Sequence, residues 1–413
     1  MNSPLSRAGN SAYVSRMVET HCDILISGGG VAGLTAAAAF GEAGFDVMIV
    51  DPMPPITSIA QKGADLRTTA FLQPAQDFLA RAGLWDRLEQ FSTPLATMAI
   101  VDASKEPAVR RAFEAKDISD APFGWNLPNW LLRREMLARI DELGSVDFRS
   151  GVGFKSVVSR TSAALVRLSD GAKVHTKLVI GADGRGSAVR KAADIGVKTT
   201  HYGQSALTFA VTHETPHDNI STEVHKSGGP FTLVPLPDHE GKPCSAVVWM
   251  TNSADAKRLA NLDETEFNAE ATFRSSGVLG HLSVATRRTV WPIISQIADR
   301  LIAPRTALVA EAAHVMPPIG AQGLNMSLSD LSCLLDLSEQ HRNALGENTM
   351  LDAYQRARHA DVKLRVAGID MLNRASIAGN PVFQDMRRWG VQALHDIKPV
   401  RTGLMRMGLG AKG

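Results

Sequence analysis

The fold of this chain is decided by the stretch Asp23-Ile24-Leu25-Ile26-Ser27-Gly28-Gly29-Gly30-Val31-Ala32-Gly33. Its first five residues are mostly apolar and branched, which is typical of a buried parallel strand. Gly28 permits a tight turn, Gly30 lets a pyrophosphate approach the backbone, and Gly33 lets the next helix pack close to the strand. The alanine-rich residues 34–42 fit that helix. The stretch therefore predicts the start of a dinucleotide-binding domain.

The residues that follow complete the unit. The amino end of the helix at 34–42 offers N–H groups and a positive dipole to a phosphate. Residues 45–50 read as the second strand, and Asp51 ends it, 23 residues after Gly28. An acid at this place hydrogen-bonds a ribose hydroxyl and disfavours a 2′-phosphate. The pattern therefore predicts FAD or NAD rather than NADP.

Two later segments also run from an apolar strand into a loop. Residues 178–180 lead into Gly181-Ala182-Asp183-Gly184, and Ser187 has the place of a helix N-cap. Residues 306–309 lead into Ala310-Glu311-Ala312-Ala313-His314, and then into Pro318-Ile319-Gly320-Ala321-Gln322-Gly323-Leu324-Asn325, which opens a helix. Each segment alone fits an ordinary turn, in which Asp183 caps a helix and His314 is a satisfied structural histidine. The three in this order indicate a flavin site.

In their order and separation the three segments resemble those of the FAD-dependent aromatic hydroxylases with the p-hydroxybenzoate-hydroxylase fold. The ubiquinone-biosynthesis (UbiH-type) hydroxylases are the most similar branch, and the resemblance runs from about Cys22 to about Leu335. It implies that NAD(P)H or a protein electron donor reduces FAD, and that a flavin C4a-hydroperoxide then hydroxylates an aromatic ring. The substrate it implies is a polyprenylated phenol on the way to ubiquinone, with O2 as co-substrate.

The resemblance also assigns a set of cofactor-binding residues. In it Asp183 sits over the pyrophosphate, Glu311 binds the ribityl chain, and the helix at Asn325 faces the flavin pyrimidine, where its dipole stabilises the reduced ring. Pro318 shapes the pocket, and no catalytic side chain is assigned because the chemistry belongs to the flavin. Arg67 is implied to begin the helix after the ribose-binding strand. The full set is Gly28, Gly30, Val31, Ala32, Gly33, Asp51, Arg67, Arg134, Asp183, Glu311, Gly323, Leu324 and Asn325.

The third segment departs from the family pattern in three places. Ala310 and Ala321 stand where the family has glycines, and Glu311 stands where it has Asp. We expect the longer Glu311 carboxylate to keep the ribityl contact through a shift of the local backbone.

The predicted fold is α/β, with a Rossmann-like FAD-binding domain, an inserted antiparallel β-sheet substrate domain and C-terminal helices. The predicted parts are a flexible tail at 1–20, the FAD-binding domain at 21–197 and 293–345, the substrate sheet at 198–292, and a helical region at 346–413. Strands are expected at 206–212, 221–226, 231–235 and 245–251, and the last helices at 350–372 and 380–395.

Bulk properties narrow the partners and the location. A net charge of +2 gives no sign of a nucleic-acid partner. Three widely spaced cysteines indicate a reducing compartment, here the cytoplasm, and no ligand cluster predicts a metal. The basic, Leu- and Met-rich end after residue 387 fits both a frayed terminus and contact with an anionic membrane. Peripheral contact with the inner membrane and membership of a quinone-biosynthesis complex stay open.

Two other functions share these motifs. One is a flavin-dependent reductase of isoprenoid double bonds, which oxygen consumption with stoichiometric hydroxylated product would distinguish from a hydroxylase. The other is a non-catalytic accessory flavoprotein of a quinone-biosynthesis complex, which would bind FAD yet fail to complement a hydroxylase-deficient strain.

Overall fold

The computed structural model describes residues 19–377, except 63, 65, 66 and 227, and also residues 402, 403 and 405. Its first sheet has the strand order β18-β19-β11-β1-β2-β8, with β10 beside β11 and β9 beside β10. These strands are β1 (Glu19–Ser27), β2 (Val47–Asp51), β8 (Val146–Ser150), β9 (Phe154–Ser159), β10 (Ala164–Leu168), β11 (Lys173–Gly181), β18 (Ile302–Ala303) and β19 (Thr306–Leu308).

The central strands of this sheet are parallel. β1 lies between β11 and β2, and β19 and β8 extend the parallel set on either side. The carboxyl ends of β1, β2, β11 and β19 therefore meet at one edge, where ligands of open α/β sheets bind. All three segments singled out in the sequence follow one of these carboxyl ends.

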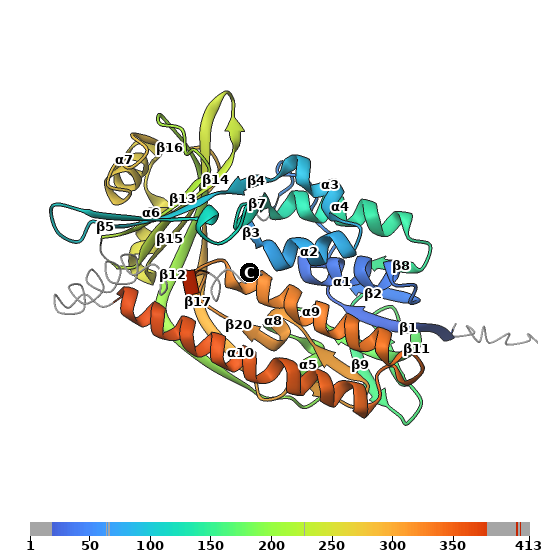
Figure 1. Cartoon of the computed structure of the whole chain (residues 1–413). Coiled ribbons are helices and arrows are strands. Elements are labelled where there is room, and N and C mark those ends of the chain that lie inside the picture. The colour runs from blue at the N-terminus through green and yellow to red at the C-terminus, as the bar shows by residue number, and fades with distance from the viewer. Residues whose placement is uncertain are drawn as a thin grey trace, which may run out of the picture.

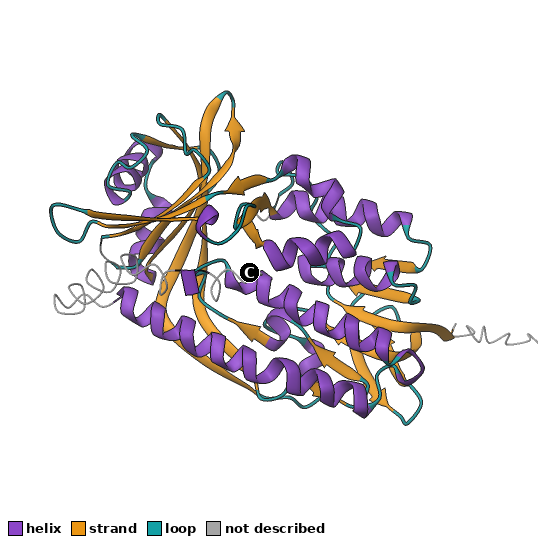
Figure 2. Ribbon diagram, in the orientation of Figure 1, coloured by secondary structure: helices purple, strands orange, loops and turns teal. Residues whose placement is uncertain are grey.

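Helices cover both faces of the first sheet (Figure 2). They include α1 (Val31–Glu42), α2 (Gln73–Arg81), α3 (Trp85–Leu88), α4 (Asn129–Glu142), α5 (Ala188–Ala192), α8 (Ala310–Ala313), α9 (Gln322–Gln340) and α10 (Asn348–Ile377), with short turns η1 (Glu89–Phe91) and η3 (Arg342–Ala344). A further short turn, η2 (Ala115–Asp117), packs instead in a separate cluster with Leu95 and Phe123. α1 is buried almost throughout, because its alanines let α4 and α9 approach closely. The long helix α10 runs beside α9 from the first sheet to the second (Figure 1).

The second sheet has the order β20-β17-β12-β15-β14-β13-β5-β6, with β16 beside β12. Its strands are β5 (Thr97–Asp102), β6 (Val109–Glu114), β12 (Val197–His213), β13 (Ile220–His225), β14 (Pro230–His239), β15 (Lys242–Asn252), β16 (Leu282–Val284), β17 (Thr289–Ala298) and β20 (His314–Val315). α6 (Ser253–Asn261) and α7 (Glu264–Arg274) cover one face through a cluster that includes Leu207, Phe209, Leu259 and Phe267.

This second sheet contains the four predicted strands and differs from the predicted sheet in its extent and in its strand directions. It also includes β5 and β6, from residues assigned to the FAD-binding domain, and β17, which continues past residue 292 to Ala298. The sheet is also not wholly antiparallel, since β13 pairs with β5 in parallel. That pairing covers the β13 edge, which would otherwise expose unpaired backbone groups. The domain limits themselves stay a prediction.

Two local predictions differ from the structure. Glu19 and Thr20 were predicted as part of the tail, but both belong to β1. They pair there with Lys173 and Val174 of β11. Arg67 precedes not a helix but β3 (Thr68–Leu72), which pairs with β7 (Gly124–Pro128), itself paired with β4 (Thr93–Leu95).

The strand at β3 has a simple cause, because Thr68, Thr69 and Phe71 favour extended backbone. The helix predicted at 350–372 is confirmed as α10, while the one predicted at 380–395 lies outside the described residues. No helix among the described residues is both long and apolar enough to cross a membrane.

Candidate cofactor site

Backbone hydrogen bonds join the three loops at the carboxyl edge of the first sheet. The Gly28 N–H donates to the Val50 carbonyl at 2.8 Å, and the Ala182 N–H donates to the Ser27 carbonyl at 2.8 Å. The Val309 N–H donates to the Gly181 carbonyl at 3.0 Å. Segments separated by more than a hundred residues thus form one row, and together they make one site.

The glycines of the first loop meet the expected demands on space. A Cβ on Gly28, at φ +118°, would collide with the Ala182 carbonyl, and one on Gly33 would collide with the Gly28 carbonyl. A Cβ on Gly30 would meet nothing within 4 Å. No side chain caps α1, which begins at Val31. Open space at Gly30 and uncapped N–H groups at a helix start are what a pyrophosphate needs.

Asp51 stands at the end of β2 and faces the glycine loop. Its Oδ2 accepts the Gly29 N–H at 2.5 Å, and its Oδ1 accepts the Met53 N–H at 2.8 Å. These bonds fix the carboxylate beside the loop and leave lone pairs on both oxygens. Its predicted contact with a ribose stays a prediction.

Asp183 caps α5 in the second loop. Its Oδ2 accepts the N–H groups of Ala188 at 2.7 Å and Val189 at 3.1 Å, and its Oδ1 accepts the Ser187 hydroxyl. Ser187 caps the same helix through the Arg190 N–H, as predicted. The capping role of Asp183 is therefore present, and its place over a pyrophosphate stays a prediction.

The third loop has a backbone conformation that glycine favours, although alanine occupies the position. Ala310 has a φ of +54°, in the left-handed region that glycine favours. Glu311 follows at the start of α8 and is exposed, and no described side chain forms an ion pair or hydrogen bond with it. Its carboxylate is therefore available to a ligand at the carboxyl edge.

The start of α9 is also uncapped and partly exposed. Its N-cap residue, Ala321, has a φ of +55°, and no side chain caps the helix. Gly323 is exposed and Leu324 is half-buried against the main core.

Asn325 is already engaged with protein backbone. Its Oδ1 accepts the Leu72 N–H at 2.9 Å, and its Nδ2 lies 2.7 Å from the carbonyls of both Ala70 and Ala321. The side chain thus fastens α9 to β3, and the predicted cofactor contact of this residue stays a prediction.

Pro318 lies exposed next to an apolar part of the second sheet. The residue after it, Ile319, packs on a cluster of Ala206, Met250 and Ile293. These three come from the neighbouring strands β12, β15 and β17. The sheet therefore places an apolar wall beside the loop that opens α9.

The two arginines predicted to bind the cofactor have other contacts here. The Arg67 guanidinium lies 4.4 Å from the ring centroid of Trp291, which places it against the second sheet. Arg134 is exposed, with its Nε 2.7 Å from Glu135 and its guanidinium 5.2 Å from the Phe91 ring centroid. None of these partners belongs to the three loops, so both FAD contacts stay predictions.

One buried residue that the sequence reasoning missed is Arg190. It donates from Nη1 to the Ala312 carbonyl and from Nη2 to the Arg185 carbonyl, both at 2.8 Å. It therefore ties the second loop to the third. Nothing local in the sequence marks it, because Arg190 stands three residues after the N-cap Ser187 and only the fold shows that it is buried.

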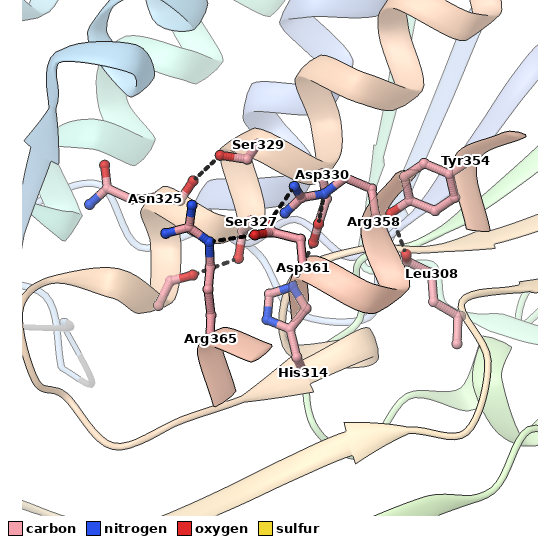
Figure 3. Close-up of polar contacts among 11 residues, drawn as sticks. Leu308, His314, Asn325, Ser327, Ser329, Asp330, Tyr354, Arg358, Asp361 and Arg365 are labelled. Atoms are coloured by element: carbon pink, nitrogen blue, oxygen red, sulfur yellow. Dashed lines mark hydrogen bonds and ion pairs between the residues drawn. The ribbon is translucent and has the colours of Figure 1, made fainter. Parts of the chain in front are cut away.

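His314 forms part of a second missed cluster, which Figure 3 shows. Its Nε2 lies 2.5 Å from Asp330 Oδ2, and Arg358 Nε donates to Asp330 Oδ1 at 2.8 Å. Burial would raise the pKa of Asp330, but His314 and Arg358 together hold that pKa below its usual value. His314 is itself buried, in keeping with the predicted structural role.

The residues at the carboxyl edge fit FAD. Two uncapped helix starts, the open space at Gly30 and the unpaired Glu311 carboxylate match its phosphates and ribityl chain. Among the described residues no group of His, Cys, Asp or Glu is arranged to hold a metal ion. The fold and the site thus define the class of protein. It is a flavin-dependent enzyme built of a nucleotide-binding sheet and a second sheet that places apolar side chains near the cofactor edge.

Comparisons with known proteins agree with this class. The family described as FAD binding domain matches residues 21–367. The ubiquinone hydroxylase UbiL of Rhodospirillum rubrum is 32% identical, over 94% of this chain and 89% of that protein. The 3-demethoxyubiquinol 3-hydroxylase of Escherichia coli is 24% identical, over 95% of this chain and 100% of that protein.

The fold recurs in solved structures. That of p-nitrophenol 4-monooxygenase PnpA from Pseudomonas putida superposes with a TM-score of 0.78 at 17% identity, over 96% of this chain and 100% of that one. The chain belongs to the FAD binding domain family, as a UbiH-type class A flavin monooxygenase. The predicted p-hydroxybenzoate-hydroxylase-like fold and the FAD cofactor are confirmed.

Proposed function

We propose that this protein hydroxylates the aromatic ring of a polyprenylated phenol in ubiquinone biosynthesis. The observation that carries the proposal is the meeting of three flavin-type loops at one sheet edge, in a chain similar over nearly its whole length to a ubiquinone hydroxylase. FAD, when reduced, supplies the activation of O2. One oxygen atom enters the ring and the other leaves as water, with two electrons from NAD(P)H or a protein donor.

In this proposal FAD lies along the carboxyl edge of the first sheet. The loop of Gly28, Gly30 and Gly33, with the N–H groups of Val31 and Ala32, holds the pyrophosphate. Asp51 takes the ribose, and Asp183 closes over the phosphates. Glu311 takes the ribityl chain, and the first turn of α9 with Gly323 and Leu324 faces the flavin ring.

The protein's part in the reaction is to orient the substrate ring and to exclude water. The cluster of Ala206, Met250 and Ile293 with Ile319 supports this, because Ile319 directly follows Pro318 in the chain. Apolar side chains around a binding site favour an apolar substrate ring, and they strengthen electrostatic interactions once water is excluded. The cluster therefore supports a prenylated substrate better than a charged one.

Two finer parts of the proposal concern location. We propose that the basic, Leu- and Met-rich end of the chain contacts an anionic membrane, and that the enzyme works within a quinone-biosynthesis complex. Truncation after Pro399 should weaken flotation with anionic liposomes and spare FAD binding. Equal flotation of both proteins would show that this end does not bind lipid.

Quinone analysis of a deletion strain tests the function. Loss of the gene should accumulate an under-hydroxylated quinone precursor, and the wild-type gene should restore the normal profile. The Gly30→Leu variant, which lacks room for the pyrophosphate, should not restore it. A normal profile in the deletion strain, with no second hydroxylase present, would contradict the proposal.

A further inference from the structure

Asp330 is a completely buried carboxylate outside the three cofactor loops. His314 holds one of its oxygens at 2.5 Å and Arg358 the other at 2.8 Å (Figure 3). It lies on α9, eight residues after Gln322, the first residue of that helix. Eight residues span about 12 Å along a helix axis, so this buried charge lies within two to three turns of the proposed flavin site.

Two more contacts join α10 to the part of α9 that precedes this carboxylate. Met326 packs with Val362 and Val366 in one apolar cluster. Arg365 then donates from Nη1 to Gln322 Oε1 at 3.4 Å. The two helices therefore run antiparallel and touch from the middle of α9 to its first turn.

The same carboxylate also fixes α8. His314 directly follows α8, which carries Glu311. The first turn of α9 has no side-chain cap and begins at a left-handed Ala321. Its placement comes from the Asn325 side chain, which fastens this turn to β3, and from contacts further along the helix. Asp330 is the point where α8, α9 and α10 are joined.

Stability alone does not explain a charge pair at this place. A buried ion pair contributes little net stability compared with apolar residues of the same volume, although loss of one partner is strongly destabilising. What the pair does specify is geometry, because a shift of α9 along α10 would leave a buried charge without its partner. The charges also balance: Arg358 Nη1 reaches Asp361 at 2.8 Å, and Arg365 Nε reaches Asp361 at 2.9 Å.

We propose that Asp330 and Arg358 are positioning residues for the flavin. Through them α10 holds the first turn of α9, and through His314 it holds α8, against the bound FAD, while their opposite charges cancel near the ring. This rests on the FAD site of the proposed function. It goes beyond that function by giving a role to a helix that lies outside all three loops.

The reduction potential of the bound flavin tests the charge part of the proposal. Arg358→Met removes one positive charge, which disfavours the anionic reduced flavin and lowers the potential, although His314 still contacts the carboxylate. Asp330→Asn removes one negative charge and raises the potential, although Asp361 still pairs with the guanidinium. The double variant Asp330→Leu with Arg358→Met carries neither charge and should return close to the wild-type value. Shifts of equal sign in the two single variants, or no shift, would overturn this part.

The dissociation constant of FAD tests the positioning part. We expect Arg358→Met and the double variant each to weaken FAD binding about tenfold, because the first turn of α9 is then held by Asn325 and β3 without the support of Arg358 on α10. Arg358→Lys keeps the positive charge but loses the planar guanidinium. Its dissociation constant for FAD should therefore lie between those of these two variants and that of the wild type. Arg356→Met is the matched control on the same helix, since Arg356 is exposed, and should bind FAD as wild type does.

Thermal unfolding of the apo proteins separates positioning from folding. If Arg358→Met does not fold, the double variant and Arg358→Lys carry the test. A double variant that binds FAD as tightly as wild type would overturn the positioning role. A wild-type protein that binds no FAD would instead refute the cofactor site on which the proposal rests.

Discussion

The loop after β1 and the loops around α8 and α9 serve one cofactor edge, but they meet their backbone demands differently. Gly28 has a φ of +118° and its missing Cβ makes room for the Ala182 carbonyl. Ala310 and Ala321 have nearly the same left-handed φ, +54° and +55°, and yet carry a Cβ. The first loop needs glycine because of space, whereas the third only prefers it for backbone energy. A steric demand admits no substitute, and a conformational preference of about 1–2 kcal/mol does.

The largest expected effect breaks the first loop. Gly33→Ala places a Cβ against the Gly28 carbonyl, between the strand end and α1. Overpacking of this kind typically costs about 1–3 kcal/mol, and here it also moves the pyrophosphate loop. We expect a lower urea midpoint for the apo protein and loss of bound flavin. A Gly33→Ala variant that keeps wild-type stability and yellow colour would show that the strand and helix can separate without consequence.

Gly30→Leu is the matched control in the same loop. A Cβ there meets no protein atom and the backbone is of ordinary extended type, at φ −74°. We expect the apo stability to change by no more than about 0.5 kcal/mol, as for most exposed substitutions. FAD binding should be lost all the same, because the side chain fills the place of the pyrophosphate. Both measurements together separate the space needed by the protein from the space needed by its ligand.

The next effect sharpens the comparison at Glu311, where the family has Asp. A hydrogen bond to a charged group is worth about 1.5–3 kcal/mol, so Glu311→Ala should weaken FAD binding by about one to two orders of magnitude. Glu311→Asp should lose much less, because it restores the family acid. Dissociation constants measured by flavin fluorescence check both. An alanine variant that binds FAD as tightly as wild type would show that Glu311 does not reach the ribityl chain.

The comparison also shows which parts of the site sequence reasoning can reach. The strand, glycine loop and helix at Gly28 to Gly33 follow local rules of period, turn and close approach, and the structure has them where predicted. Arg190 and Arg358 were missed because their partners, the Ala312 carbonyl and Asp330, are distant in the chain. Only the fold brings such partners together. An acid on the buried face of α9 was the one local sign.

Arg67 shows the opposite limit. The resemblance placed it at a helix start, but the β-branched Thr68 and Thr69 favour a strand, and the guanidinium stacks on Trp291 of the second sheet. The recruitment of β5 by β13 was equally out of reach, because strand order depends on which edge is left to cover.

Acid should act through Asp330 on the place where α8, α9 and α10 are joined. Its pKa is lowered in the folded state, so the carboxylate contributes stability that is present above its unfolded pKa of about 3.9. That stability is lost as the pH falls through the folded pKa, at up to about 1.4 kcal/mol per pH unit for one proton. Urea unfolding at about pH 5 and about pH 3 measures the slope. The free energy of unfolding of Asp330→Asn should depend less steeply on pH than that of the wild type. An unchanged pH dependence would assign the acid sensitivity to other carboxylates.

The smallest effect tests whether the two alanines are a matter of backbone energy alone. The left-handed conformation costs a non-glycine residue about 1–2 kcal/mol, which a glycine avoids. The glycine in turn destabilises the folded state by about 0.5–1 kcal/mol, because its unfolded chain has more conformational freedom. Ala310→Gly and Ala321→Gly should therefore each stabilise the apo protein by about 0.5–1 kcal/mol in urea unfolding. Ala312→Gly, in the same short helix α8 but without a positive φ, should instead lose about 0.5–1 kcal/mol. If Ala310→Gly destabilised the protein as Ala312→Gly does, the Cβ of Ala310 would be needed for packing. The third loop would then be constrained by the space available to its side chains, as the first loop is.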